Sequence, residues 1–172
     1  MVFELLAPRL LAPWLGSSVE VWTAVIACLV SGYVVGNVIG GKWADREPSL
    51  KKMSWLLLLV AVWFALMPWS VTWIGSVGMG ASWSIWVSCL LLFLCPTVVL
   101  AMVFPFVLKR EAQSFSDLGR RLGGMGMWSA LGSLIGVYGT GFFLLAYVST
   151  TVILFLLAGL TVCLSLLMRR NG

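Results

Sequence analysis

Long apolar runs separated by short polar connections dominate the pattern along the chain. Five runs are long enough to cross a bilayer: residues 21–40, 53–74, 84–107, 126–146 and 151–168. A hydrocarbon core of about 30 Å needs roughly 20 residues of helix. Because lipid offers no partner for backbone N–H and C=O groups, a helix is the expected structure of each run. The pattern therefore predicts an all-α polytopic membrane helix bundle with five transmembrane helices.

The segment before the first run, residues 1–18, is apolar but short. It is interrupted by Pro8 and Pro13 and contains Glu4 and Arg9. Two interpretations stay open: a short helix along the outer membrane interface, or the end of a longer helix whose start is absent from this chain. On either interpretation, the sequence predicts one membrane domain over residues 1–172.

Basic residues gather in three connecting segments. They are Lys42, Arg46, Lys51 and Lys52, then Lys109, Arg110, Arg120 and Arg121, and finally Arg169 and Arg170. The turns near residues 78–81 and 147–150 carry no charge. Because basic connections stay in the cytoplasm, the charge pattern predicts an outer N-terminus and a cytoplasmic C-terminus.

Composition supports a membrane protein and narrows the chemistry. Hydrophobic residues make up 61% of the chain and charged residues 10%, whereas an average soluble domain has about 45–50% and about 25%. The basic clusters follow topology, so we expect no nucleic-acid partner. The chain has no histidine, which excludes a Ser/His/Asp triad and haem ligation by histidine. We therefore expect no cofactor, no metal site and no catalytic residues.

Two apolar runs carry small residues at a spacing of four. The first run has Gly32, Gly36 and Gly40, and the fourth has Gly132, Gly136 and Thr140. This spacing places small residues on one helix face and allows two backbones to approach closely in lipid. We expect both faces to serve helix packing, either on each other or on a partner, with a substrate path as the less favoured alternative.

Three polar residues near or inside the runs are candidates for substrate or partner contact. Asn37 lies within the first run, where an interhelical hydrogen bond is favoured over a ligand contact. Glu4 and Arg9 are five residues apart, poorly phased for one helix face, and a functional pair is the less favoured interpretation. The five runs contain no carboxylate, which argues against a proton relay.

Several motifs occur in order along most of the chain. They are residues 3–13, Gly41-Lys42-Trp43-Ala44-Asp45-Arg46, residues 119–123 and residues 129–136. Together they resemble the membrane half of the fused membrane/spermidine-synthase-like proteins of bacteria. The resemblance implies a half major-facilitator-like helical region in the bacterial cytoplasmic membrane. The soluble synthase-like half of that family has no counterpart in these 172 residues.

The stretch ending in Asp45 and Arg46 is also similar to the start of the facilitator loop motif, Gly-x-x-Ala-Asp-Arg. The later Gly-Arg-Lys part is replaced here by residues 47–50. A structural brace by Asp45 at a helix end is therefore favoured over a facilitator-type gate. Asp45 and Arg46 remain candidates for substrate or partner contact.

Two functional hypotheses follow. The first is a membrane partner or scaffold subunit, with the lipid bilayer and another protein chain or further copies of itself as partners. The alternative, implied by the resemblance, is a small oligomeric transporter of a polyamine or another small solute, because half-transporters must assemble to enclose a path. A membrane enzyme is the least favoured class.

Overall fold

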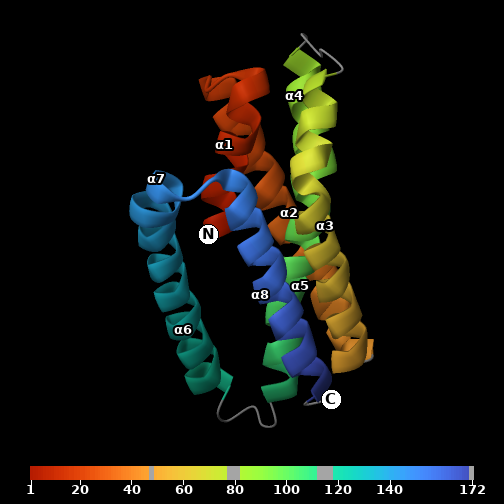
Figure 1. The fold of residues 1–172 in the computed structure, drawn as a ribbon. Coiled ribbons are helices and arrows are strands. Elements are labelled where there is room, and N and C mark those ends of the chain that lie inside the picture. Colours follow the sequence, from red (N-terminus) through yellow and green to blue (C-terminus); the bar gives the residue numbers. More distant parts are fainter. Residues whose placement is uncertain (47–48, 77–81, 112–117, 171–172) are drawn as a thin grey trace.

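The computed structural model describes residues 1–46, 49–76, 82–111 and 118–170, and these form helices with no strand among them (Figure 1). The elements are α1 Val2–Leu15, α2 Val19–Arg46, α3 Leu50–Ser76, α4 Ser82–Cys89, η1 Leu90–Leu94, α5 Cys95–Glu111, α6 Leu118–Tyr138, η3 Gly139–Leu144, α7 Leu145–Tyr147 and α8 Thr150–Arg170. The prediction of an all-α helix bundle is confirmed.

Five stretches of helix are long and apolar enough to cross a membrane. They are Val19–Arg46, Leu50–Ser76, Ile85–Lys109, Gly119–Tyr147 and Thr150–Arg170. Each matches one of the five predicted runs, and the chain is accordingly a membrane protein. The C-terminal ends of α2, α5 and α8 and the start of α6 lie together (Figure 1). We call this end of the bundle the basic end, because Arg46, Lys109, Arg120 and Arg170 lie there.

The glycine face of α2 lies against α5. A Cβ added at Gly32 would meet Thr97 Cβ at 2.9 Å, and one at Gly40 would meet the backbone Cα of Met102 at 2.7 Å. Such distances leave no room for any side chain. In lipid no hydrophobic force draws helices together, so this close van der Waals contact is what stabilises the pair.

Helices α3 and α8 form a second tight pair, with a buried hydroxyl contact between them. The Ser165 hydroxyl donates to the Ser54 carbonyl oxygen at 2.8 Å, and the two hydroxyl oxygens are also 2.8 Å apart. Nearer the basic end, the Arg169 guanidinium lies 5.8 Å from the centre of the Trp55 ring. A cation over an indole face is attracted by the ring quadrupole, which adds to the contact between the two helices.

Helix α1 lies inside the bundle, where other helices enclose it. Leu6 and Ala7 are fully buried, and the Phe3 ring lies 4.9 Å from Phe64 and 5.5 Å from Phe93. Apolar side chains surround α1 on several flanks because α2, α3, α6 and α8 all contact it. The N-terminus lies near mid-height of the bundle (Figure 1).

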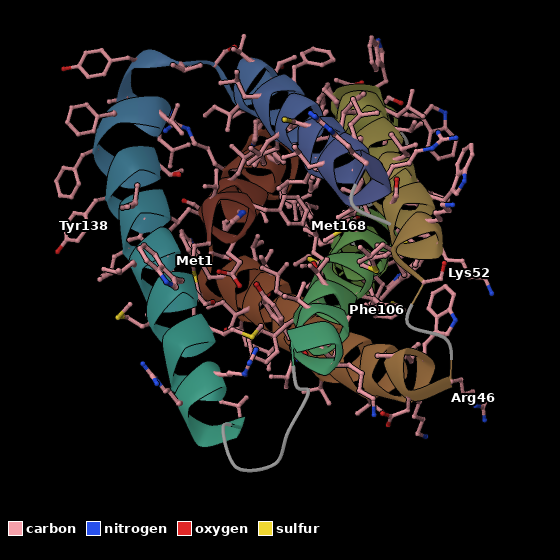
Figure 2. All side chains as sticks on the ribbon, turned by 90° about the horizontal axis from the view of Figure 1, so that it is seen from below. Met1, Arg46, Lys52, Phe106, Tyr138 and Met168 are labelled. Atoms are coloured by element: carbon pink, nitrogen blue, oxygen red, sulfur yellow. The ribbon has the colours of Figure 1, made fainter. Side chains whose placement is uncertain are left out.

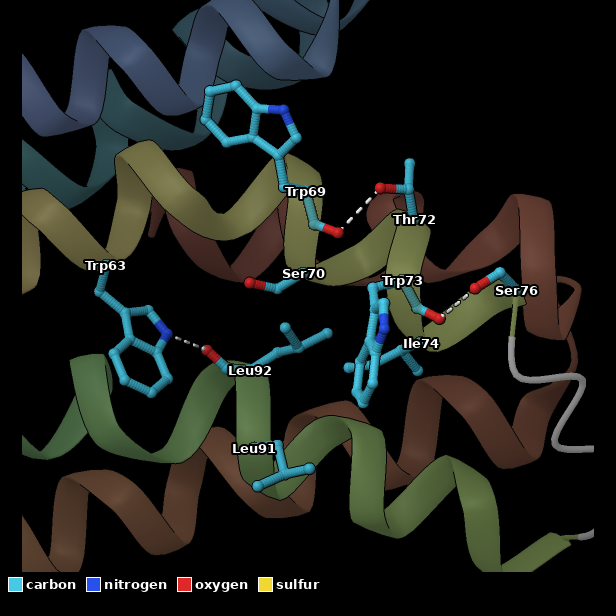
Figure 3. Close-up of a pocket in the computed structure, with 9 residues that line it drawn as sticks. All are labelled: Trp63, Trp69, Ser70, Thr72, Trp73, Ile74, Ser76, Leu91 and Leu92. Atoms are coloured by element: carbon cyan, nitrogen blue, oxygen red, sulfur yellow. Dashed lines mark hydrogen bonds between the residues drawn. The ribbon is translucent and has the colours of Figure 1, made fainter.

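A proline explains the π-helical segment η1 and its side-chain contact. Pro96 has no N–H, so the Leu92 carbonyl four residues earlier loses its usual helical partner. The Trp63 indole N–H on α3 donates to that carbonyl at 3.1 Å. The carbonyl left free by Pro96 thus accepts a hydrogen bond from a neighbouring helix, which also ties α3 to η1 (Figure 3).

Helix α6 is attached far more loosely than the other spans. Only 6% of its span is buried, against 28–50% in the other four. Figure 1 shows α6 set apart from the α3–α8 pair, with α7 leading back to α8 at the end opposite the basic end. The bundle therefore consists of a compact body and one peripheral helix.

Candidate functional site

A cavity of about 630 Å³ lies between α6 and the compact body. Its lining is contributed by three helices. The residues are Tyr33 and Asn37 of α2, Leu100, Ala101, Val103, Phe104 and Val107 of α5, and Met125 and Ser129 of α6. We call it the α6 cavity. Asn37 and Ser129 both lie in the halves of their membrane spans, Val19–Arg46 and Gly119–Tyr147, that are nearer the basic end, so the cavity does too.

Two polar side chains of the α6 cavity, Asn37 and Ser129, lack hydrogen-bond partners within the described part of the chain. Neither the Asn37 amide nor the Ser129 hydroxyl hydrogen-bonds any described residue, although several hydroxyls of α3 and α8 do. An unpaired polar group facing hydrocarbon is costly. Water, a lipid headgroup or a partner molecule must therefore meet these two groups in the membrane.

A carboxylate lies beside the cavity. Glu4 Oε2 is 3.3 Å from the amino group of Met1. Tyr33, which lines the cavity, lies close enough to this carboxylate to interact with it electrostatically. Glu4 thus has a charged partner at the N-terminus, which lies near mid-height of the bundle (Figure 1) and is labelled as Met1 in Figure 2.

Arg9 contacts a different element. Its Nη1 donates to the Leu145 carbonyl oxygen at 2.7 Å. That carbonyl lies in α7, which ends where the backbone of Val148 becomes extended. As one of the last carbonyls of the helix, it has no helical N–H partner. The structure therefore gives Glu4 and Arg9 separate partners instead of bringing them together. The Arg9 contact fastens the end of α6 and η3 to α1.

The two small-residue faces do not pack on each other. The glycines of α2 face α5, whereas a Cβ at Gly132 would meet nothing within 4 Å. A Cβ at Gly136 would come only to ordinary contact with Val2, at 3.5 Å. The Thr140 hydroxyl is fully buried and has no hydrogen-bond partner among the described residues. Of the two expected arrangements, mutual packing is therefore excluded.

Asp45 and Arg46 lie at the basic end of α2. The Lys109 ammonium donates to Asp45 Oδ1 at 2.7 Å, which joins the ends of α2 and α5. Both side chains are more than half exposed, and such surface pairs contribute about 0–1 kcal/mol. Arg46 is exposed. Neither Asp45 nor Arg46 lines the α6 cavity.

A second hollow of about 790 Å³ lies between α3 and the η1 region and is lined by Trp63, Trp69 and Trp73 (Figure 3). Its hydroxyl groups are already paired, since Thr72 donates to the Trp69 carbonyl and Ser76 to the Trp73 carbonyl. Interfacial tryptophans of this kind serve as membrane anchors. The hydroxyl groups of its described lining are thus paired within α3, and the exposed indoles of Trp69 and Trp73 fit the role of such anchors.

The sequence indicated Asn37 as a candidate contact residue but did not indicate the cavity around it. The spacing of four between Tyr33 and Asn37, and between Met125 and Ser129, puts each pair on one helix face. This spacing can be read from the sequence. Which helix faces meet across the cavity, however, depends on how α6 packs. Within the described residues, no group of three His, Cys, Asp or Glu side chains could hold a metal ion.

Comparison of the chain with protein-family models, with curated proteins and with solved structures finds no match. What is established is therefore the class: an all-α membrane helix bundle with five helices able to span a bilayer. The resemblance to the membrane half of spermidine-synthase-like fusion proteins rests on the sequence motifs alone.

Proposed function

We propose that this protein is a membrane-embedded partner subunit without catalytic activity of its own, and that another membrane chain packs against α6. The observation that carries the proposal is the 6% burial of the α6 span, against at least 28% in each other span. Transmembrane helices associate through close packing, and α6 has little of it within this chain. A partner on the α6 side would complete the bundle.

The outward face of α6 and η3 is the surface that we assign to the partner. Trp128, Ile135 and Phe142 are each about 70% exposed there. Tyr138 and Phe142 stack with ring centres 5.9 Å apart, and Tyr138 points away from the bundle in Figure 2. Rigid aromatic side chains are enriched at protein interfaces because they bury a large area at low entropic cost. The partner is either a different chain or a second copy of this one.

The charge pattern and the resemblance supply the cellular setting. We propose a multi-pass protein of the bacterial cytoplasmic membrane, with the basic end in the cytoplasm and α1 entering from the outer side.

Cysteine cross-linking in native membranes tests the proposal. In a background with the exposed Cys95 and Cys163 changed to alanine, Ile135→Cys should form an interchain adduct. The matched control is Leu160→Cys on α8, which is also more than half exposed and apolar. Recovery of a single chain in mild detergent, with no adduct from Ile135→Cys, would contradict the partner proposal.

One observation favours the transport alternative, namely the α6 cavity, whose Asn37 and Ser129 hydrogen-bond no described residue. A cationic solute such as a polyamine would need a carboxylate, and Glu4 is the candidate beside the cavity. Uptake into liposomes by the wild type, lost in Glu4→Gln, would support transport. Equal background uptake by empty liposomes, wild type and variant would remove this candidate.

A further inference from the structure

A small cavity lies at the end of the bundle opposite the basic end. Its volume is about 270 Å³, and its lining consists of Val19, Glu20 and Thr23 of α2 and Ile85 and Trp86 of α4. We call it the Glu20 cavity. All of its lining residues belong to the described part of the chain. Helix α2 and the helix that continues from α4 into α5 both end at the basic end, so their first turns lie together at the opposite end (Figure 1).

Among the described residues, no cation balances the carboxylate of Glu20. This side chain is exposed and forms no ion pair or hydrogen bond with a described residue. Arg46 lies at the other end of α2, whose 28 residues span about 42 Å, far beyond the screening length of roughly 10 Å in salt. The first turn of α2 contributes only about half a positive charge, so the carboxylate keeps a net negative charge. The Glu20 cavity therefore attracts a cation.

A second acceptor lies beside this carboxylate. Glu20 and Thr23 are three residues apart, so their side chains are neighbours on one face of α2. The Thr23 hydroxyl donates its proton to the Val19 carbonyl oxygen at 2.8 Å, which leaves the lone pairs of the hydroxyl oxygen as acceptors. The cavity thus presents acceptors from two side chains to a cation that carries N–H donors.

The indole of Trp86 forms the aromatic wall of the cavity, and its side chain is 48% exposed. A cation beside an indole ring is attracted by the ring quadrupole, and methylene groups pack against the same apolar surface. Trp69 and Trp73 on α3 differ from Trp86, because the described lining of their hollow contains no carboxylate. The combination of a carboxylate, a hydroxyl acceptor and an indole is therefore particular to the Glu20 cavity among the hollows described above.

We propose that the Glu20 cavity binds a primary alkylammonium group, R–NH3⁺, at the membrane surface opposite the basic end. The three N–H donors of such a group match the acceptors of Glu20 and Thr23, and its methylene stem matches Trp86. A quaternary ammonium has no N–H donor and is bound by cages of several aromatic rings, whereas one indole lines this cavity. The volume of about 270 Å³ lies below the usual range of drug-sized sites, roughly 300–1,000 Å³, and suits a single small group.

The first arm of the test measures binding of free ethanolamine to the full chain in uncharged maltoside micelles, by saturation-transfer NMR. Choline, the quaternary counterpart, should bind at least about tenfold more weakly, because it cannot donate to the carboxylate. Glu20→Gln should weaken ethanolamine binding by about tenfold or more, and Trp86→Leu by about threefold. The matched controls Glu4→Gln and Trp69→Leu remove a carboxylate and an exposed indole elsewhere, and should bind like the wild type.

The second arm identifies the source of the ammonium group. After reconstitution in equal parts of phosphatidylethanolamine and phosphatidylcholine, native mass spectrometry measures which lipid the chain retains. Preferential retention of phosphatidylethanolamine, lost in Glu20→Gln, identifies a lipid headgroup, whereas binding of free ethanolamine without such retention identifies a soluble amine. Both results support the proposal.

Three results would overturn it: no binding in either arm, equal binding by the wild type and Glu20→Gln, or choline bound as tightly as ethanolamine. Glu20 and Trp86 are both exposed, so the variants should fold, and an unchanged unfolding temperature checks this. The inference does not depend on the partner proposed for the outward face of α6. The cross-link from Ile135→Cys should persist in Glu20→Gln, so failure of the ammonium site is distinguishable from failure of the partner proposal.

Discussion

The compact body and the peripheral helix α6 use the same sequence signal with opposite results. Gly36 on α2 meets Ala101 of α5 so closely that an added Cβ would lie 2.6 Å from the Ala101 Cβ. Gly132 on α6 belongs to the same kind of face, yet an added Cβ would touch nothing within 4 Å. Small residues at a spacing of four therefore permit close packing, but a complementary small surface on the opposing helix is what produces it.

Polar side chains also differ between the compact body and the α6 side. In the body, Ser54 and Ser165 are buried and paired, and Thr97 donates to the Phe93 carbonyl at 2.7 Å. On the α6 side, Asn37 and Ser129 lack partners among the described residues. Most buried hydroxyls of the described body thus have internal partners, with Ser88 as an exception, whereas Asn37 and Ser129 on the α6 side need another molecule or water.

Leucine substitution at the two glycines should give the largest difference between these regions. Gly36→Leu would place a side chain against the Val98 carbonyl and Ala101, and should destabilise the protein by more than about 3 kcal/mol, beyond ordinary overpacking. Gly132→Leu should leave the unfolding midpoint in detergent within about 0.5 kcal/mol, as at unconstrained positions. Thermal unfolding followed by size-exclusion chromatography measures both. Equal losses in the two variants would remove the distinction between body and peripheral helix.

Trp63→Phe should have the next largest effect, within the body alone. The phenylalanine ring keeps most of the contact area but leaves the Leu92 carbonyl without its indole donor. An unsatisfied buried acceptor costs about 1–3 kcal/mol. Denaturation in mixed micelles should show a loss of that size, and Trp69→Phe is the control, because its exposed ring donates no hydrogen bond to a described residue. A loss no larger than that of the control would argue against a stabilising Trp63–Leu92 bond.

The division between body and α6 also marks how far the sequence could predict the structure. The five spans were predictable because lipid excludes almost every alternative to an apolar helix. Pro96 in the sequence also indicates that the Leu92 carbonyl lacks a helical N–H partner. It does not indicate that the Trp63 indole donates to that carbonyl. The interior position of α1 was not predictable, since Phe3 and Leu6 show only that this segment is apolar and not which helices surround it.

The candidate site was harder still to predict. Asn37 was recognisable as an amide inside an apolar run, but its neighbours Met125 and Ser129 come from a helix almost a hundred positions away. Their meeting depends on the weak attachment of α6 through Arg9 and Gly136, which no local pattern encodes. Sites formed between weakly packed elements are therefore the least predictable part of this fold.

A double-mutant cycle at Ser54 and Ser165 should show a smaller effect. The two hydroxyls are buried and bonded at 2.8 Å, so Ser54→Ala and Ser165→Ala should be coupled by about 0.6–1.7 kcal/mol, the range measured for interhelical hydrogen bonds. The matched cycle pairs Ser54→Ala with Ser129→Ala, whose hydroxyl hydrogen-bonds no described residue, and it should show coupling near zero. Coupling of equal size in both cycles would mean that the α3–α8 contact carries no specific energy.

The smallest change in overall stability is expected at Arg9, where the two regions meet. Arg9→Gln removes the charged donor to the Leu145 carbonyl, so the end of α6 should separate from α1 more often. The body does not depend on this contact, and the global unfolding midpoint should shift by less than about 0.5 kcal/mol. Hydrogen exchange should nevertheless accelerate in residues 136–147 while the α3–α8 pair stays protected, because local opening can occur without global unfolding. Faster exchange in α3 and α8 as well would show that α6 belongs to the cooperative body, and the comparison between the two regions would fail.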